Sequence, residues 1–424
     1  MTTSSTPAAG NHAARRTSIV CSIAALAAVL AACGGGGGAA GALPTGATVN
    51  AQAPGSNALS QTYAAGPAAQ VNPEAAGQQV LLATGASGGG HGIAWLSQGD
   101  GSPSATVHMR RFDAQGVAAG DGFSTPIDAS QGRPAAAVLP DGGFVVAGTV
   151  SGPASAEEPW VTRSAIRVQR FDAGGNRLAD TEVGAVLQDR IGATTLRYVA
   201  DPALVRWADG SFLLGWAQVE EDADGRHPQF WVQRFDATGQ PLGSPSQAAA
   251  GETDSGFQLT AAPSGGWVLT TFHRLMGHTA LRYHPFEGAS APLLPTGAAG
   301  MAEGSLLVPL QGGGTVVLSP VKVYGSLQLY AADGQAQGYA GTMPTPPLAA
   351  TALPDGGFVV IAGDPVSGLV AYRFDALAHP VGDPVAVAAG ADVQVAALAG
   401  GGLLLAWTAT GASGDTDVVA QRLR

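Results

Sequence analysis

The densest group of acidic residues in the chain is the run Glu220-Glu221-Asp222-Ala223-Asp224-Gly225. Clustered carboxylates, together with main-chain carbonyls, are the ligands that calcium prefers in proteins. The alternation of acids ends after Asp224, and no distal glutamate follows to complete a calcium-binding loop. Asp222 and Asp224 are therefore candidate calcium ligands only as a fragment of such a loop. No other metal or cofactor is predicted.

Three histidines, His273, His278 and His284, form the other group that could bind a metal, because three imidazoles can hold zinc. Their spacing matches no established zinc motif, so a chance cluster is the better interpretation. The sequence also lacks a Gly-x-Ser-x-Gly nucleophile elbow, a phosphate-binding loop and a dinucleotide-binding fingerprint. No catalytic residue is predicted, and nothing in the chain identifies a reaction.

These residues are carried by a repeating pattern of short apolar runs and glycine-rich turns. The clearest copy has an apolar run at 135–139, the turn Pro140-Asp141-Gly142-Gly143 and a second apolar run at 144–148. After a variable loop come Ile166–Asp172, another turn and a weaker strand. Asp-Gly and Gly-Gly between apolar runs predict hairpins, because these residues accept positive φ. Each unit is predicted to have four antiparallel strands, named A to D.

Both halves of the pattern recur along the chain. The A–B turn recurs at 88–90, 208–211, 264–266, 311–313, 354–357 and 399–401. The C strand recurs as Arg111-Phe112-Asp113, Arg234-Phe235-Asp236, Arg282-Tyr283, Gln328-Leu329-Tyr330, Arg373-Phe374-Asp375 and Gln421-Arg422-Leu423. Four-stranded units spaced roughly 45 to 65 residues apart are typical of a β-propeller. The predicted fold is all-β, a seven-bladed β-propeller of four-stranded antiparallel blades.

The two ends of the repeat region complement each other. The seventh unit stops at Arg424, directly after its C strand, and has no D strand of its own. The segment 67–71 is similar in spacing and composition to the sixth D strand at 384–387. We expect this N-terminal strand to close the last blade, since a propeller needs that edge paired. The alternative is an open β-solenoid or sandwich array, which would need capping units that the sequence does not show.

Strand order predicts which loops share an end of the domain. The short A–B and C–D turns lie at one end, and the B–C and D–A loops lie at the other. The B–C and D–A loops carry the long insertions, which are 97–105, 151–164, part of 181–197, and 220–229. We call this second end the B–C/D–A end and expect binding there. Its predicted acidic rim consists of Glu157, Glu158, Glu220, Glu221, Asp222, Asp224, Asp415 and Asp417, with Asp100 and Asp364 nearby. A solvated acidic face, a calcium site and a dock for a cationic partner all remain open.

The residues that recur in every unit are predicted to be architectural. The Phe of each Arg-Phe-Asp is expected to pack between blades. The Arg and Asp are expected to pair with each other or with the turn backbone.

The N-terminal segment has the order of an export signal. Arg15 and Arg16 precede an apolar stretch from Ile19 to Leu30, and Leu30-Ala31-Ala32-Cys33 follows. We expect cleavage before Cys33 and lipid attachment at Cys33. The predicted domains are a signal peptide at 1–32, a flexible Gly/Ala/Pro tether at 33–66 and the propeller at 67–424.

Two resemblances follow from these motifs. The Leu-Ala-Ala-Cys order resembles bacterial lipoproteins, in which an aspartate after the cysteine is the usual inner-membrane retention signal. Gly34 at that position implies the outer membrane, with the domain periplasmic or surface-exposed. The repeats in 67–424 resemble largely uncharacterised bacterial secreted and surface propellers with an Asp-Gly-Gly-Phe-Val-Val and Gln-Arg-Phe-Asp-Ala-x-Gly consensus. That resemblance implies architecture and no activity.

Charge limits the partners. The chain carries a formal charge of −11, and removing Arg15 and Arg16 with the signal gives 18 basic and 31 acidic residues, or −13. Lys322 is the only lysine, which argues against nucleic acid and anionic lipid as partners. We expect a membrane-anchored binding or scaffolding module with an envelope protein or glycan partner. The alternatives are an enzyme acting on an extracellular glycan or polymer, favoured if charges converge on the channel, and a calcium-dependent adhesion module.

Overall fold

The computed structural model describes most of the repeat region. The described residues are 68–73, 77–98, 104–128, 132–189, 194–251, 255–262, 266–273, 279–284, 291–292, 304–321, 324–331, 335–364, 366, 368–387, 389–399, 401–411 and 414–423. The predicted signal peptide, Cys33 and the tether lie outside them. Regular structure in this part of the chain is β-strand, so the predicted all-β class is confirmed. None of it forms a helix long and apolar enough to cross a membrane.

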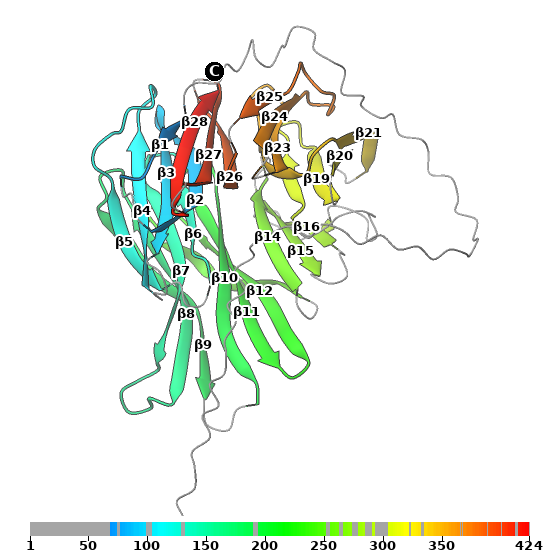
Figure 1. Cartoon of the computed structure of the whole chain (residues 1–424). Helices are drawn as coiled ribbons and strands as arrows, with labels where there is room; N and C mark the ends of the chain where they lie inside the picture. The colour runs from blue at the N-terminus through cyan, green and yellow to red at the C-terminus, as the bar shows by residue number, and fades with distance from the viewer. Residues whose placement is uncertain are drawn as a thin grey trace, which may run out of the picture. The chain divides into compact units, whose positions relative to one another are not determined.

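Five antiparallel sheets contain four strands each in chain order, as the repeat predicts (Figure 1). The first two are β6 (Ala135–Val138), β7 (Phe144–Pro153), β8 (Val161–Phe171), β9 (Arg177–Asp189) and β10 (Leu196–Arg206), β11 (Phe212–Asp222), β12 (Gly225–Phe235), β13 (Pro241–Ala250). The next is β14 (Ser255–Ala261), β15 (Trp267–His273), β16 (Thr279–His284), β17 (Ala291–Pro292). The last two are β18 (Leu306–Pro309), β19 (Thr315–Val321), β20 (Tyr324–Tyr330), β21 (Ala336–Met343) and β22 (Pro347–Ala352), β23 (Phe358–Asp364), β24 (Gly368–Phe374), β25 (Val385–Val387).

The first and last repeat units are joined to each other. Their strands are β2 (Gln78–Ser87), β3 (Gly90–Gln98), β4 (Ser104–Phe112), β5 (Phe123–Asp128) and β26 (Ala391–Ala397), β27 (Leu403–Thr410), β28 (Thr416–Leu423). One parallel pair, Gln78 with Thr416, links β2 to β28. The short strand β1 (Ala69–Gln70) pairs with the same edge of β28, opposite to the edge that β27 occupies, with Ala69 opposite Ala420. The N-terminal segment therefore lies beside the last C strand, where the sequence predicts it.

Each B strand is buried on both of its faces. Alternate side chains of a strand point to opposite sides of the sheet. Phe144 and Val146 enter a cluster with Met109 of the preceding sheet, and Val145 enters a different cluster with Phe212 of the following sheet. Full burial of one such side chain stabilises the fold by about 1.5–3 kcal/mol. The sheets are thus held together by apolar layers on both sides.

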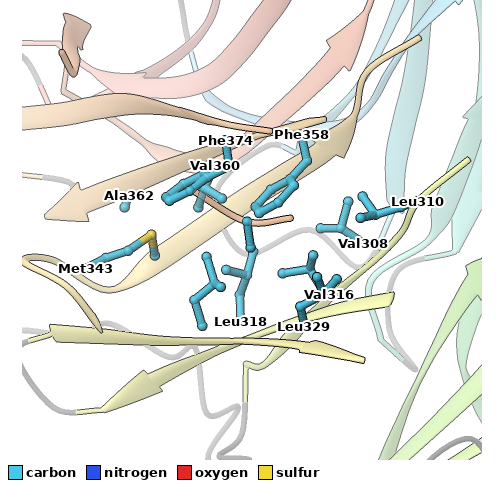
Figure 2. Close-up of a cluster of buried hydrophobic side chains, with 12 residues drawn as sticks. Val308, Leu310, Val316, Leu318, Leu329, Met343, Phe358, Val360, Ala362 and Phe374 are labelled. Atoms are coloured by element: carbon cyan, nitrogen blue, oxygen red, sulfur yellow. The ribbon is translucent and has the colours of Figure 1, made fainter. Parts of the chain in front are cut away.

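Figure 2 shows one of these layers, between the sheets β18–β21 and β22–β25. Phe358 and Phe374 lie opposite each other on β23 and β24, with ring centroids 4.9 Å apart. They pack against Val308 and Val316 of the neighbouring sheet. The prediction that the Phe of the Arg-Phe-Asp motif packs between sheets is confirmed here.

The Asp-Gly-Gly turn has a distinct use for each residue. Asp141 Oδ1 accepts a hydrogen bond from the Gly143 amide at 2.9 Å. Gly142 has a φ of 86°, which residues with a Cβ rarely adopt. A Cβ on Gly143 would lie 2.3 Å from the carbonyl oxygen of Phe171, so only glycine lets β7 approach the C strand there.

The recurring Arg and Asp of the C strand bind turns, as predicted. Asp172 Oδ1 accepts hydrogen bonds from the amides of Gly174 and Asn176, both at 2.8 Å. Arg170, whose side chain is 1% exposed, binds Asp141 of its own A–B turn and donates from Nε to the Ala237 carbonyl of the next sheet at 3.1 Å. The arginine therefore ties one unit to the next.

Replacing this arginine should weaken the fold. Arg170→Met keeps the apolar stem but leaves the Ala237 carbonyl without its donor, and we expect a loss of about 2–3 kcal/mol in the free energy of unfolding. Urea unfolding followed by tryptophan fluorescence measures it. The matched control is Arg177→Met, which removes a half-exposed ion pair with Asp180 and should cost less than about 0.5 kcal/mol. Equal losses in the two variants would contradict the role given to Arg170.

Candidate binding surface

At the B–C/D–A end, two neighbouring sheets, β6–β9 and β10–β13, depart most from the repeat because their strands are longer. Strands β8, β10, β11 and β12 have 11 residues each and β9 has 13, and Figure 1 shows them extending past the other sheets. The segments 181–197 and 220–229, which the sequence assigns partly or wholly to long loops, are mostly strand. This end is therefore built from extended hairpins, which hold side chains more rigidly than loops do.

Glu220 and Glu221 lie on β11 and not in a loop, which corrects the sequence prediction. Arg197 is opposite Glu220 on β10, and its Nη2 lies 2.8 Å from Glu220 Oε1. The hydroxyl of Tyr198 donates to Glu221 Oε2 at 2.7 Å. Both carboxylates are thus bound within the domain.

Tyr198 is the centre of a small polar network between β10 and β12. Arg226 Nε donates to the Tyr198 hydroxyl at 3.1 Å, and Arg226 Nη2 lies 3.7 Å from Asp201 Oδ2. Burial, and then the hydrogen bond to Glu221, raise the pKa of Tyr198 to about 12. The hydroxyl therefore stays protonated at neutral pH and serves as a donor in this network.

Asp222 and Asp224, the calcium candidates, lie at a tight hairpin turn, with Asp222 at the end of β11 and Asp224 in the two-residue turn before β12. Asp222 Oδ1 accepts a hydrogen bond from the Asp224 amide at 2.9 Å and lies 3.2 Å from His227 Nε2. The Asp224 amide and then His227 hold the pKa of Asp222 below its usual value. In the part of the chain that the structure describes, no three His, Cys, Asp or Glu side chains are grouped to hold a metal ion.

Glu157 and Glu158 lie in the turn between β7 and β8, as predicted, and both are exposed. Neither carboxylate has an ion-pair partner among the described residues. The turn also carries Trp160, which is 44% exposed. Leu187 of β9 and Leu196 of β10 are 60% and 52% exposed, and the Arg197 amide next to Leu196 donates to Gln188 Oε1 at 2.7 Å. Large apolar side chains and free carboxylates therefore share this end, although the sequence shows only the acids.

Asp415 and Asp417, at the other side of the predicted rim, are half-buried. Asp417 Oδ1 accepts hydrogen bonds from Gln70 Nε2 and from Asn72 Nδ2, both at 2.9 Å. The Val418 amide donates to Asn72 Oδ1 at 2.8 Å. Asp417 therefore holds the N-terminal segment against β28 and is not part of an open rim.

The remaining candidates fall elsewhere. Cys33, Asp100 and His278 lie outside the described residues. His284 is opposite Trp267 on the β15–β16 hairpin, and His273 is six residues further along β15, or about 20 Å away. The hairpin thus holds His273 and His284 apart.

Sequence reasoning missed a group of charged residues at the first strands of the sheets. Arg133, just before β6, pairs with Asp392 of β26 at 2.8 Å and also binds the Leu81 carbonyl of β2. Asp392 and Asp201 have φ values of 49° and 54° and sit at irregularities of β26 and β10. In the sequence, this group could have been recognised from an aspartate that interrupts an otherwise apolar A strand.

Comparison with known proteins gives structural similarity alone. No protein-family model and no curated protein matches the chain. A Pyrococcus horikoshii acylaminoacyl peptidase is similar over 80% of this chain and 50% of its own, with 12% identity and a TM-score of 0.45. The β-propeller domain of the Trilobed protease from Pyrococcus furiosus is similar over 81% of this chain and 93% of its own, with 9% identity and a TM-score of 0.43. Prolyl oligopeptidase B from Galerina marginata is similar over 79% of this chain and 47% of its own, with 14% identity and a TM-score of 0.40. The chain spans about half the length of the two peptidases, and these similarities assign it no activity.

The stability of variants distinguishes Asp417, which is hydrogen-bonded within the domain, from the exposed Glu157 and Glu158. Asp417→Ala leaves the Asn72 side-chain amide, in a residue that is 3% exposed, without its acceptor, and we expect a loss of about 1–3 kcal/mol in unfolding free energy. Glu157→Ala and Glu158→Ala should stay within about 0.5 kcal/mol of the unaltered protein. Thermal and urea unfolding of the three variants measure this. An Asp417→Ala variant as stable as the other two would return Asp417 to the candidate rim.

Proposed function

We propose that this chain is a lipid-anchored envelope protein whose β-domain is a seven-bladed propeller that binds a polypeptide partner at its B–C/D–A end. The observation that carries the binding role is the combination of exposed Trp160, Leu187 and Leu196 with two exposed carboxylates, Glu157 and Glu158, that have no ion-pair partner among the described residues. Exposed large apolar side chains at one end of a scaffold, bordered by charged residues, are typical of interaction sites.

The contacts between sheets support the propeller. The first strands contact one another in the order β2, β6, β10, β14, β18, β22 and β26, and β26 contacts β2. Arg422 of the last unit binds the Ala114 carbonyl of the first, just as Arg111 binds Ala173 one unit further on. An open array would leave the outer faces of its two end sheets uncovered.

The pairing of charges indicates the partner's chemistry. The cations near this end are engaged, since Arg163 pairs with Glu182 and Arg197 with Glu220. The carboxylates of Glu157 and Glu158 have no described counter-charge. The surface therefore favours a partner segment that offers basic side chains beside apolar ones.

The anchor and the location rest on the sequence. Leu30-Ala31-Ala32-Cys33 supports lipid attachment at Cys33, and Gly34 supports the outer membrane. A tether over 33–66 has a root-mean-square reach of roughly 30 Å, which would hold the propeller clear of the lipid headgroups. A partner in the periplasm or at the cell surface would be within reach.

Site-specific photo-crosslinking in intact cells tests the binding surface. A photoreactive phenylalanine at position 160 should give a discrete crosslinked polypeptide, and one at exposed Leu377, in a C–D turn at the opposite end, should not. Glu157→Gln with Glu158→Gln should reduce the yield about fivefold, because two exposed ion pairs at ~0.5 kcal/mol each would be lost. Equal products at both positions, or none at position 160, would contradict the proposal.

A second candidate is a polar small-molecule or glycan site at the first strands. The observation that favours it is that Arg133 pairs with Asp392 of another sheet, while Asp201 of a third sheet lies beside Gly132, the residue before Arg133. Arg133 and Asp201 are about half exposed, so their polar groups remain accessible. Charges that meet at the mouth of a propeller channel suit the hydroxyl and carboxyl groups of a sugar.

This candidate predicts a thermal shift. A panel of neutral and acidic oligosaccharides should contain members that raise the melting temperature of the unaltered protein by a few degrees, as ligand binding at saturation does. Arg133→Gln should abolish the shift. Arg163→Gln, which removes a pair on the outer strands, should keep it. A panel with no stabilising member would count against the glycan reading while leaving the polypeptide surface untouched.

A further inference from the structure

His91 occupies a position that phenylalanine fills in other sheets. Phe144, Phe212 and Phe358 each begin a B strand, and each lies opposite the Phe of the following C strand. His91 lies opposite Phe112 in the same register, with ring centroids 4.9 Å apart and planes 8° from parallel. An ionisable ring thus replaces an apolar one in a packing arrangement that recurs along this chain.

The His91–Phe112 pair lies where the first repeat unit, β2–β5, meets the last, β26–β28. Phe112 packs against an apolar cluster to which the last sheet contributes Leu404 and Val418, and the N-terminal segment contributes Val71. We call this contact between β2–β5, β26–β28 and residues 69–72 the first–last junction. A proton taken up by His91 would therefore place a charge where the two ends of the repeat meet.

Three charged groups surround the His91–Phe112 pair. Arg422 of β28 and Asp113 after β4 act on His91 electrostatically, and the Arg110 guanidinium lies 5.8 Å from the Phe112 ring centroid. Two cations against one carboxylate disfavour a further positive charge. His91 itself is 3% exposed, and its Nδ1 has no hydrogen-bond partner in the described part of the chain. A proton on Nδ1 would therefore have neither water nor an acceptor within reach among the described residues.

We propose that the first–last junction is a pH-sensitive joint that opens when His91 is protonated. Opening would hydrate the imidazolium and release the strand pairing of Ala69 and Gln70 with β28. The joint is independent of the binding surface at the B–C/D–A end, because His91 lies at the start of β3 beside the A–B turn.

The pH range follows from the sign of the linkage. Burial, followed by Arg422, lowers the pKa of His91 from its ordinary 6.5 to about 4, against an opposing effect of Asp113. The closed state therefore binds the proton less well than the open state. Stability of the closed junction is complete above pH 6.5, is lost as the pH falls from 6.5 to 4, and changes no further below that.

Hydrogen exchange read by mass spectrometry tests the joint in the full chain. At pH 5 peptides covering 69–72 and 416–423 should exchange about 30-fold faster in the unaltered protein than in His91→Phe, the value expected if opening fully hydrates the ring. Comparing variants at one pH cancels the pH dependence of intrinsic exchange. At pH 7.5 the two proteins should exchange equally. Equal rates at pH 5 would overturn the proposal.

Two further variants guard against a merely structural effect. His91→Leu copies Leu403, which holds the corresponding position in the last sheet, and it should remove the acid response as His91→Phe does. Phe358→His, made in the His91→Phe background, should transfer the response to peptides of β23. An acid response at 416–423 that persists in both non-titrating variants would show that another group opens the junction.

Discussion

Every other feature of this domain depends on the need to cover both faces of each sheet. The B strand Phe144–Ala147 is at most 1% exposed at each residue, with its side chains divided between the clusters shared with the preceding and following sheets. A sheet that is apolar on both faces is stable only between two neighbours. The last sheet obeys the same rule, because Leu404 and Ala406 pack with Leu81 and Ile93 of the first sheet.

That constraint separates repeated residues from unique ones. Turn aspartates such as Asp141, the glycines beside them and C-strand arginines such as Arg170 hold strands and neighbouring units together, so they are unavailable for binding. Unique chemistry appears only where the pattern is interrupted: at Trp160 in an extended hairpin, at Arg133 and Asp392 along the first strands, and at His91 within the core. The last of these shows that a departure from a repeat need not lie in a loop.

The sequence predicts the local parts of this structure well. Turn residues and apolar runs define four-stranded units because hairpins depend on neighbouring residues, and the roles of Asp172 and Arg170 follow from their recurrence. It fails where contacts are long-range. Glu220 and Glu221 read as loop because glutamate disfavours strands, yet Arg197 lies opposite Glu220 on β10 and Arg226 lies opposite Glu221 on β12, so that each has a cross-strand neighbour of opposite charge. Asn72, which binds Asp417, lies 345 residues away in the chain, and no local pattern announces it.

Long-range pairing, which the sequence does not predict, also changes how the acidity of the chain is understood. A net charge of −11 and a cluster of acids suggest a uniformly negative face. Four of the eight predicted rim carboxylates are bound within the domain: Arg197 binds Glu220, Tyr198 binds Glu221, His227 binds Asp222, and the side-chain amides of Gln70 and Asn72 bind Asp417. Charges further apart than about 8–10 Å are screened in physiological salt. What a partner would meet at the B–C/D–A end is a few carboxylates around exposed apolar side chains. Recognition there would draw its affinity from apolar contact at Trp160, while Glu157 and Glu158 would orient the partner and speed its approach.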